Sequence, residues 1–273
     1  GVDGIMLMGA FFGFFAVFKT ESLLLGLLAA AAVGGIMGLI LCVVSITFQA
    51  EQGISGIGLF MFGLGASSLL FKTMVGTIEG VQGFSNLRFC LGNFCLADMP
   101  ILGDVLFSHS LMTYGAFALV PIAWWVLNKT TWGLTVRAVG QNPEAADSLG
   151  VNVIRVRYTA VTLGGVLAGI AGASLSISLL GGIFQENLTN GMGFIAVALV
   201  YFGSWKPTGV LIGALLFSTV NALQLWAQVL NLNIPSDVAV MMPYLLTIIA
   251  LALPFQRSLQ PAMLTKPFSR GEN

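Results

Sequence analysis

The side chains with the most hydrogen-bonding capacity in the apolar parts of this sequence are neutral amides and hydroxyls. Asn221, Gln224 and Gln228 recur at a spacing that places them along one helix face. Ser174 and Ser178 share a helix face in the same way. Such groups can line a wet path for an uncharged hydrophilic solute, or they can form hydrogen bonds between helices. The sequence alone leaves both interpretations open.

Groups for covalent or metal chemistry are scarce. His109 is the one histidine in the chain, so no Cys/His cluster has zinc spacing, and we expect no metal site and no cofactor. No phosphate-binding loop of the form G-x-x-x-x-G-K-[ST] occurs. The long apolar runs carry no Lys or Arg and no Asp or Glu away from their ends, which disfavours an ion-coupled carrier. The sequence therefore predicts no catalytic residue and no ATP hydrolysis in this chain.

The cysteines divide between two settings. Cys42 lies in a long apolar run, where it is expected to fill space as a small apolar side chain. Cys90 and Cys95 fall in a segment that we expect to lie outside the membrane. An oxidising exterior would permit a disulfide between them, and two free thiols are the alternative.

The elements that position these groups must be helices in a lipid bilayer. Hydrophobic residues make up 57% of the chain, charged residues 8%, and the mean hydropathy is +0.94, whereas a soluble chain carries roughly 25% charged residues. The formal net charge is zero, so there is no basic excess for nucleic acid. We predict an all-α polytopic integral membrane protein, with a single transmembrane domain over residues 1–273.

Apolar runs long enough to cross the bilayer, which takes about 20 helical residues, predict about six full spans. They cover residues 23–46, 54–71, 105–127, 158–180, 209–230 and 238–254. Two shorter runs, Ile5–Phe18 and Met192–Trp205, suit a short span, a half-helix or a re-entrant segment better than a full crossing.

The distribution of Lys and Arg predicts the orientation, because positive loops close to the spans stay in the cytoplasm. With loop 128–158 inside, the tail after Pro254 is also inside, and loop 73–104 is outside. The inside then holds Lys129, Arg137, Arg155, Arg157, Lys206, Arg257, Lys266 and Arg270, and the outside holds Lys19, Lys72 and Arg88.

The cytoplasmic loop contains the signals of a short helix. Asn142 is a preferred N-cap, Pro143 suits the first helical position, and Glu144 places negative charge at the positive end of the helix dipole. Ala145, Ala146 and Leu149 give the helix an apolar flank, and Gly150 is placed to end it in a left-handed conformation. A helix of about two turns is marginal alone, so we expect it to have a partner.

Eleven residues of this loop carry a resemblance to a known family. They are Gly133, Leu134, Arg137, Ala138, Gly140, Asn142, Pro143, Ala145, Ala146, Gly150 and Val151, in the pattern G-L-x-x-R-A-x-G-x-N-P-x-A-A-x-x-x-G-V. This pattern resembles the coupling loop of the ATP-binding-cassette (ABC) importer permeases of the branched-chain amino acid, ribose and nucleoside superfamily. The wider permease loop continues with I-x-L-P, which has no counterpart here. In this respect the chain resembles the ribose-like branch rather than the maltose-like one.

Two further segments are similar to the same family. Gly1–Gly13 resembles its segment N-I-G-x-E-G-x-M-L-x-G-A, with Asp3 where that pattern usually has Glu, and Gln52–Gly65 also matches. The three segments together resemble nucleoside permeases most closely. The family has one more apolar span before this motif, so the resemblance implies that the first family helix is missing here and that Ile5–Phe18 is part of a broken helix.

The resemblance implies a multi-subunit importer in a bacterial plasma (inner) membrane. Its partners would be ABC ATP-binding subunits, a second permease subunit and an extracytoplasmic substrate-binding protein. The residues implied in ATPase coupling are Arg137, Gly140, Asn142, Pro143, Glu144, Ala145, Ala146 and Gly150. The expected substrate is a nucleoside taken up by alternating access. A ribose-like sugar or autoinducer permease is the first alternative, and a self-sufficient channel or ion-coupled carrier is the second.

Overall fold

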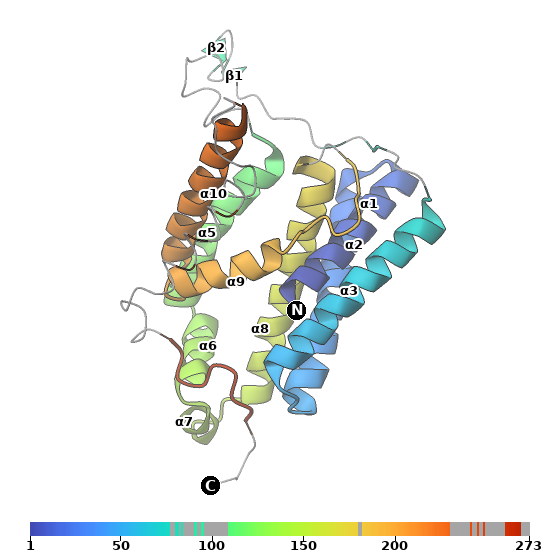
Figure 1. Ribbon diagram of the computed structural model, residues 1–273. Helices are drawn as coiled ribbons and strands as arrows, with labels where there is room; N and C mark the ends of the chain where they lie inside the picture. Colours follow the sequence, from blue (N-terminus) through green and yellow to red (C-terminus); the bar gives the residue numbers. More distant parts are fainter. Residues whose placement is uncertain are drawn as a thin grey trace. The chain divides into compact units, whose positions relative to one another are not determined.

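The computed structural model describes most of the chain (Figure 1). The described residues are 1–76, 80, 81, 83, 90, 91, 94, 95, 109–179, 182–229, 241, 245, 248 and 260–268. The chain is divided into two compact units. Unit 1 contains residues 1–119, 143–193 and 265–273, and unit 2 contains residues 120–142 and 194–264.

Long apolar helices dominate the described residues, and six are long and apolar enough to cross a membrane. They are α1 (Val2–Thr20), α2 (Leu23–Cys42) with the π-helix η1 (Val43–Thr47), α3 (Gln52–Met74), α5 (Leu111–Lys129), α8 (Val153–Ser174) with the π-helix η3 (Leu175–Leu179), and α10 (Pro207–Val229). The shorter elements are α6 (Thr131–Gln141), α7 (Pro143–Ser148), α9 (Met192–Phe202), and the strands β1 (Cys90–Leu91) and β2 (Phe94–Cys95). The predicted all-α polytopic membrane fold is confirmed.

The set of spans differs from the prediction at both ends of the chain. The run Ile5–Phe18 is not a short or broken helix, because it forms the middle of α1, which has 19 residues and meets the criterion for a span. Gly1, Asp3 and Gly4 interrupt the apolar pattern of the sequence, but the helix continues through Asp3 and Gly4 because neighbouring segments bury them. The predicted span 238–254 lies outside the described residues apart from Met241, Leu245 and Ile248, which are helical.

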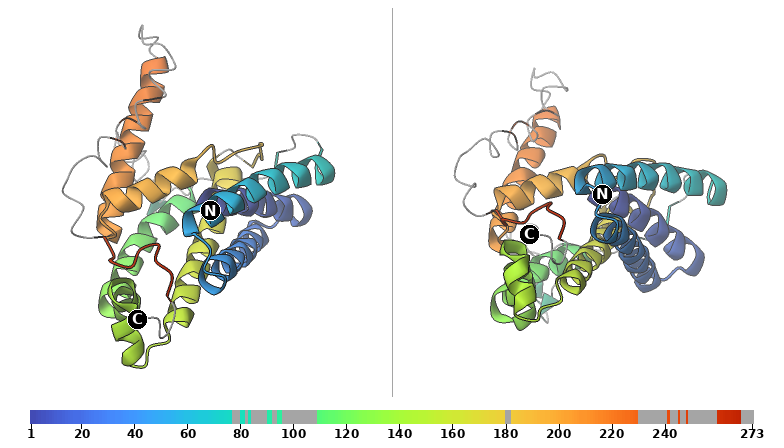
Figure 2. Two further views of the ribbon diagram at one scale, coloured as in Figure 1. Left: turned by 60° about the horizontal axis from the view of Figure 1, so that its bottom comes forward. Right: turned by 90° about the horizontal axis from the view of Figure 1, so that it is seen from below.

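In unit 1, α1 is the central helix. It packs against α2, α3 and α8, and α2 also packs against α8 (Figures 1 and 2). Residues buried on α1 occur all round the helix, whereas the described surfaces of α2 and α3 carry many exposed apolar side chains. An apolar helix that is buried on every side is typical of the core of a membrane bundle.

Glycine permits the close approach of α2 to α8. A Cβ atom at Gly34 would lie 2.9 Å from the Cα of Gly169, and one at Gly38 would lie 3.2 Å from the Cα of Gly165. Both pairs stand four residues apart on their own helices, so each helix presents one glycine face to the other. Such small-residue faces replace the hydrophobic effect, which is absent between helices in lipid, with close van der Waals packing.

Aromatic side chains form a second part of the unit 1 core. Phe11 and Phe14 of α1, Phe71 of α3 and Phe184 are buried in one cluster. The Phe184 ring lies 5.6 Å from that of Phe11 and 5.1 Å from that of Phe71, measured between ring centroids. Phe184 belongs to residues 182–193, which join η3 to α9 and which we call the return segment.

In unit 2, tight turns join consecutive helices. The Thr130 hydroxyl caps α6 by accepting a hydrogen bond of 3.1 Å from the Gly133 N–H, and it donates one of 2.5 Å to the Val126 carbonyl. Between α9 and α10, Gly203 lies so close to Gly209 that a Cβ at Gly203 would be 2.6 Å from the Gly209 carbonyl carbon. Glycine is therefore the residue that fits both turns without displacing backbone.

Candidate functional site

The short helix predicted in loop 128–158 is confirmed as α7. It begins at Pro143 and ends at Ser148. The Gly150 N–H donates to the Asp147 carbonyl at 2.9 Å, the Val151 N–H donates to the Ala146 carbonyl at 3.1 Å, and Gly150 has a φ of +85°. This pair of bonds with a left-handed glycine is the Schellman motif, which satisfies carbonyls at the end of a helix.

The two sides of α7 differ in exposure. Pro143 and Ala146 are buried, and α7 packs against α8 within unit 1. Glu144 and Ala145 are exposed, and Leu149 is 84% exposed. The helix therefore rests on unit 1 through one face and presents an acidic and an apolar residue on the other.

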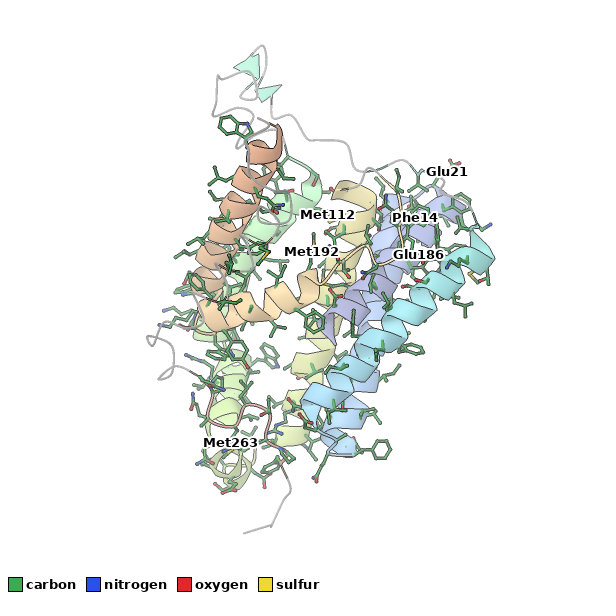
Figure 3. All side chains as sticks on the ribbon, viewed as in Figure 1. Phe14, Glu21, Met112, Glu186, Met192 and Met263 are labelled. Carbon is green, nitrogen blue, oxygen red and sulfur yellow. The ribbon has the colours of Figure 1, made fainter. Side chains whose placement is uncertain are left out.

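Two other residues of the predicted coupling set lie on α6, in unit 2. Arg137 is exposed, and Gly140 is half-buried. The Gly140 carbonyl accepts a hydrogen bond of 3.2 Å from the Met263 N–H, and a Cβ at Gly140 would lie 3.8 Å from Pro261. Asn142, which links α6 to α7, is exposed. The C-terminal tail thus contacts α6 directly, and Figure 3 labels Met263 at this place.

The tail also contacts the start of α8, within unit 1. The Arg157 guanidinium donates a hydrogen bond of 3.0 Å from Nη1 to the Lys266 carbonyl, and it lies 6.0 Å from the centroid of the Phe268 ring. In the sequence analysis, Arg157 served only to predict the orientation of the chain in the membrane. Neither this contact of Arg157 nor helix α6 was predicted. A capping Thr130 before the amphipathic run 131–141 was the available signal for α6.

The polar residues predicted to line a path lie in different units. On α10 of unit 2, Asn221 is exposed and Gln224 is 8% exposed, while Gln228 lies near the helix end with a side chain outside the described residues. In unit 1, Ser174 ends α8 and Ser178 lies in η3, and both are half-buried. Ser176, which lies between them in the sequence, is fully buried, and its Oγ donates to the Ala10 carbonyl at 3.1 Å.

Cys90 and Cys95 lie opposite each other in the short strand pair. Strands β1 and β2 are antiparallel, and their register pairs Cys90 with Cys95. Their side chains lie outside the described residues, so the disulfide stays a prediction. Cys42 is a free and buried thiol beside the Thr162 hydroxyl, 3.8 Å away, as expected for a small buried side chain.

Asp3 is the functional candidate that sequence reasoning did not single out. Its side chain is 1% exposed, and both carboxylate oxygens accept hydrogen bonds. The Thr189 hydroxyl donates to Oδ2 at 3.0 Å, and the N–H of Gly193, in the first turn of α9, donates to Oδ1 at 2.7 Å. A buried carboxylate in an apolar bundle was detectable only as an acidic residue at the edge of an apolar run.

The sequence comparisons identify relatives over nearly the whole chain. The model of the family described as "Branched-chain amino acid transport system / permease component" matches residues 1–251. The guanosine ABC transporter permease protein NupQ of Bacillus subtilis is 35% identical over 284 residues, covering 100% of this chain and 88% of the relative. The nucleoside ABC transporter permease protein NupC of Lactococcus lactis is 32% identical over 273 residues, covering 96% and 84%.

A sugar transporter is also similar. The glucose ABC transporter permease protein TsgC13 of Haloferax volcanii, a provisional name, is 37% identical over 232 residues, covering 85% of this chain and 70% of the relative. No solved structure matches the chain. The extent of the family match, together with the six apolar helices, leads to one conclusion. This chain belongs to the branched-chain amino acid transport system / permease component family and is a multi-pass membrane permease.

Proposed function

We propose that this chain is the permease subunit of an ATP-driven importer in a bacterial plasma membrane and that it passes a nucleoside by alternating access. The names of two relatives that span most of both chains support this substrate, since one is a guanosine permease and the other a nucleoside permease. Neutral amides and hydroxyls in the apolar helices suit a solute that is polar but uncharged.

The exposed face of α7 is the observation on which the proposal rests. A helix of six residues is far below the roughly 12 residues at which isolated helices become marginally stable, but α7 is fixed by the Schellman motif and by packing on α8. It presents Glu144, Ala145 and an 84% exposed Leu149 in a loop that the charge distribution predicts to be cytoplasmic. A short helix that is fixed in place and followed by an exposed apolar side chain is suited to docking on a separate ATPase.

The complete importer would contain further chains. We expect two ABC ATP-binding subunits that contact α6 and α7, a second permease subunit, and an extracytoplasmic binding protein that delivers the substrate. ATP hydrolysis would take place in the ATP-binding subunits alone. Asn221, Gln224, Gln228, Ser174 and Ser178 are the residues that we propose for the path.

A sugar is the second candidate substrate. It is favoured by the identity to the glucose permease TsgC13. Sugars and the ribose of nucleosides present similar hydroxyl groups, so the neutral polar residues of this chain suit both.

Uptake by the reconstituted importer tests both parts of the proposal. Proteoliposomes that contain this chain, its ATP-binding subunits and its binding protein should take up radiolabelled guanosine only with internal ATP. An excess of unlabelled adenosine should compete, and an excess of glucose or ribose should not. Absence of guanosine uptake, together with ATP-dependent uptake of radiolabelled glucose or ribose, would refute the nucleoside and favour the second candidate.

The docking role of α7 is tested by two changes at one position. Leu149→Asp places a charge on the proposed contact and should abolish co-purification of the ATP-binding subunits, whereas Leu149→Met keeps an apolar side chain and should retain it. Because Leu149 is 84% exposed, neither change should affect folding of the chain. Equal recovery of the ATP-binding subunits with both variants would contradict the docking role.

A further inference from the structure

The buried carboxylate of Asp3 binds the far end of the return segment, residues 182–193. The segment begins near the C-terminal half of α1, where the Phe184 ring lies 6.2 Å from that of Phe14, and reaches Asp3 at Gly193. Phe14 and Asp3 are eleven positions apart on α1, which corresponds to about 16 Å along the helix axis. Instead of leaving the bundle after η3, the chain therefore runs back along α1 before α9 starts.

The carboxylate of Asp3 lies well inside the length of the neighbouring span. A Cβ at Gly4 would be 2.6 Å from the Cα of Phe60, which is eight residues into α3 and thus about 12 Å from the start of that helix. In lipid, irregular backbone and helix ends at such a depth are tolerated only where protein satisfies their polar groups. Asp3 provides this for Gly193 at the start of α9.

The contact is specific in shape as well as in charge. A Cβ at Gly193 would lie 2.5 Å from both the backbone N and the Cα of Asp3, so glycine is the residue that permits this approach. Thr189 is fully buried, and its carbonyl accepts the Met192 N–H at 2.8 Å, which ties the hydroxyl that bonds Asp3 to the turn preceding α9. Among the residues that the structure describes, every buried side-chain N or O atom has a hydrogen-bond partner.

For a purely structural contact at this place, a carboxylate has a higher free energy of burial than a neutral polar side chain. Burial of an ionisable side chain in a membrane costs several kcal/mol, and an amide or a hydroxyl could accept the same two bonds at lower cost. The N-terminal end of a helix carries partial positive charge, which is what a carboxylate compensates better than a neutral group does. The charge of Asp3 therefore binds the start of α9 more firmly than a neutral side chain would.

We propose that Asp3 is a positioning residue of the transport cycle, which holds the return segment and the first turn of α9 against α1 so that force applied to the permease moves them as one body. This inference rests on the proposed function as an ATP-driven permease. Asp3 touches no substrate in this account. Its loss should therefore lower the maximal rate of uptake and leave the substrate concentration at half-maximal rate unchanged.

Hydrogen exchange tests the contact of Asp3 with Thr189 and Gly193, which we call the latch, without reference to transport. In lipid nanodiscs, the amides of residues 182–193 should exchange about tenfold faster in Asp3→Asn than in the wild-type chain, because a charge-assisted hydrogen bond is replaced by a neutral one. Asp3→Glu keeps the charge and should exchange at close to the wild-type rate. Unchanged exchange in Asp3→Asn would overturn the proposal.

Transport kinetics test the consequence. In the reconstituted importer, whichever neutral solute the wild type takes up, Asp3→Asn should lower the maximal uptake rate about tenfold with an unchanged half-saturating concentration, while ATP hydrolysis continues. Asp3→Glu should restore most of the rate. Equal rates for Asp3→Asn and the wild type would overturn the proposal, whereas a wild type that moves no solute would refute the proposed function and leave the exchange experiment to decide on the latch.

The hydroxyl partner provides a matched control. Thr189→Ser keeps the donor to Asp3 and should behave as the wild type in both assays, and Thr189→Val keeps the shape but removes the donor and should show the defects of Asp3→Asn in weaker form. Combining Thr189→Val with Asp3→Asn should add little to the defect of Asp3→Asn alone. Losses that multiply in the double variant would show that the two residues act separately and would contradict the latch.

Discussion

A Cβ atom on Gly165 of α8 would lie 2.5 Å from the carbonyl oxygen of Gly34 of α2. The two helices therefore touch through their backbones at this point, and a side chain of any size would force them apart. Since lipid tails are as apolar as leucine, this close packing is the main attraction between the two helices. It fixes α8, against which α7 packs.

The neighbouring glycines Gly164 and Gly165 permit a matched test of this contact. Gly165→Ala should destabilise the chain by about 1–3 kcal/mol, because the new methyl group overlaps backbone. Gly164→Ala should leave stability unchanged or raise it slightly, since no atom lies within 4 Å of the place that its new methyl group would occupy and alanine favours a helix. Thermal unfolding in one detergent measures both, and equal midpoints would contradict the described α2–α8 contact.

Phe184 should be the most sensitive residue of the return segment. It is fully buried among Phe11, Phe14 and Phe71, so Phe184→Ala leaves a cavity and should cost about 3 kcal/mol. Phe62 of α3 is 56% exposed, and Phe62→Ala should cost less than about 1 kcal/mol. Thermal unfolding again provides the measurement. A larger loss with Phe62→Ala would mean that the aromatic cluster is placed wrongly.

Gly150 should tolerate asparagine better than alanine. Its φ of +85° is left-handed, where alanine is strained by roughly 1–2 kcal/mol and asparagine by less. Gly150→Ala should loosen the end of α7 and lower the uptake obtained per ATP hydrolysed, and Gly150→Asn should do so less. The ratio of uptake to ATP hydrolysis in proteoliposomes decides this, and the reverse order of the two variants would contradict the Schellman motif.

The ion pair between Lys72 and Glu186 should matter little. Its atoms Nζ and Oε1 are 3.0 Å apart, but the side chains are 66% and 47% exposed, and pairs of this kind contribute at most about 1 kcal/mol. Glu186, labelled in Figure 3, belongs to the return segment, so Glu186→Gln is also a control for the latch at Asp3. Its uptake kinetics should match those of the wild type. A loss as large as that of Asp3→Asn would place the critical charge at Glu186 instead.

Local signals explain which parts of the structure could be predicted from the sequence. Pro143 and Gly150 fix the two ends of α7 through their own backbone preferences, so the structure confirms this helix. The short run Met192–Trp205 is confirmed as a short helix, α9, and it ends at Phe202, just before the turn at Gly203. In each case the deciding residue lies within the helix or within two residues of its end.

Tertiary partners explain what the sequence could not predict. The apolar run Ile5–Phe18 was too short to predict a full span, but α1 extends past it through Asp3. The Asp3 carboxylate accepts hydrogen bonds from Thr189 and Gly193, which are 186 and 190 positions away in the chain. The contact of Met263 with Gly140 is likewise distant in sequence and has no local pattern. The roles of Asn221, Gln224 and Gln228 stay predictions, because the face of a helix does not reveal what passes it.

Uptake by the purified chain, with and without ATP-binding subunits, tests the central claim most directly. We predict that proteoliposomes with this chain alone take up no guanosine, and that adding the ATP-binding subunits, the binding protein and internal ATP produces uptake that Leu149→Asp abolishes. Uptake by the chain alone, or uptake that is indifferent to Leu149→Asp, would contradict a permease worked through α7.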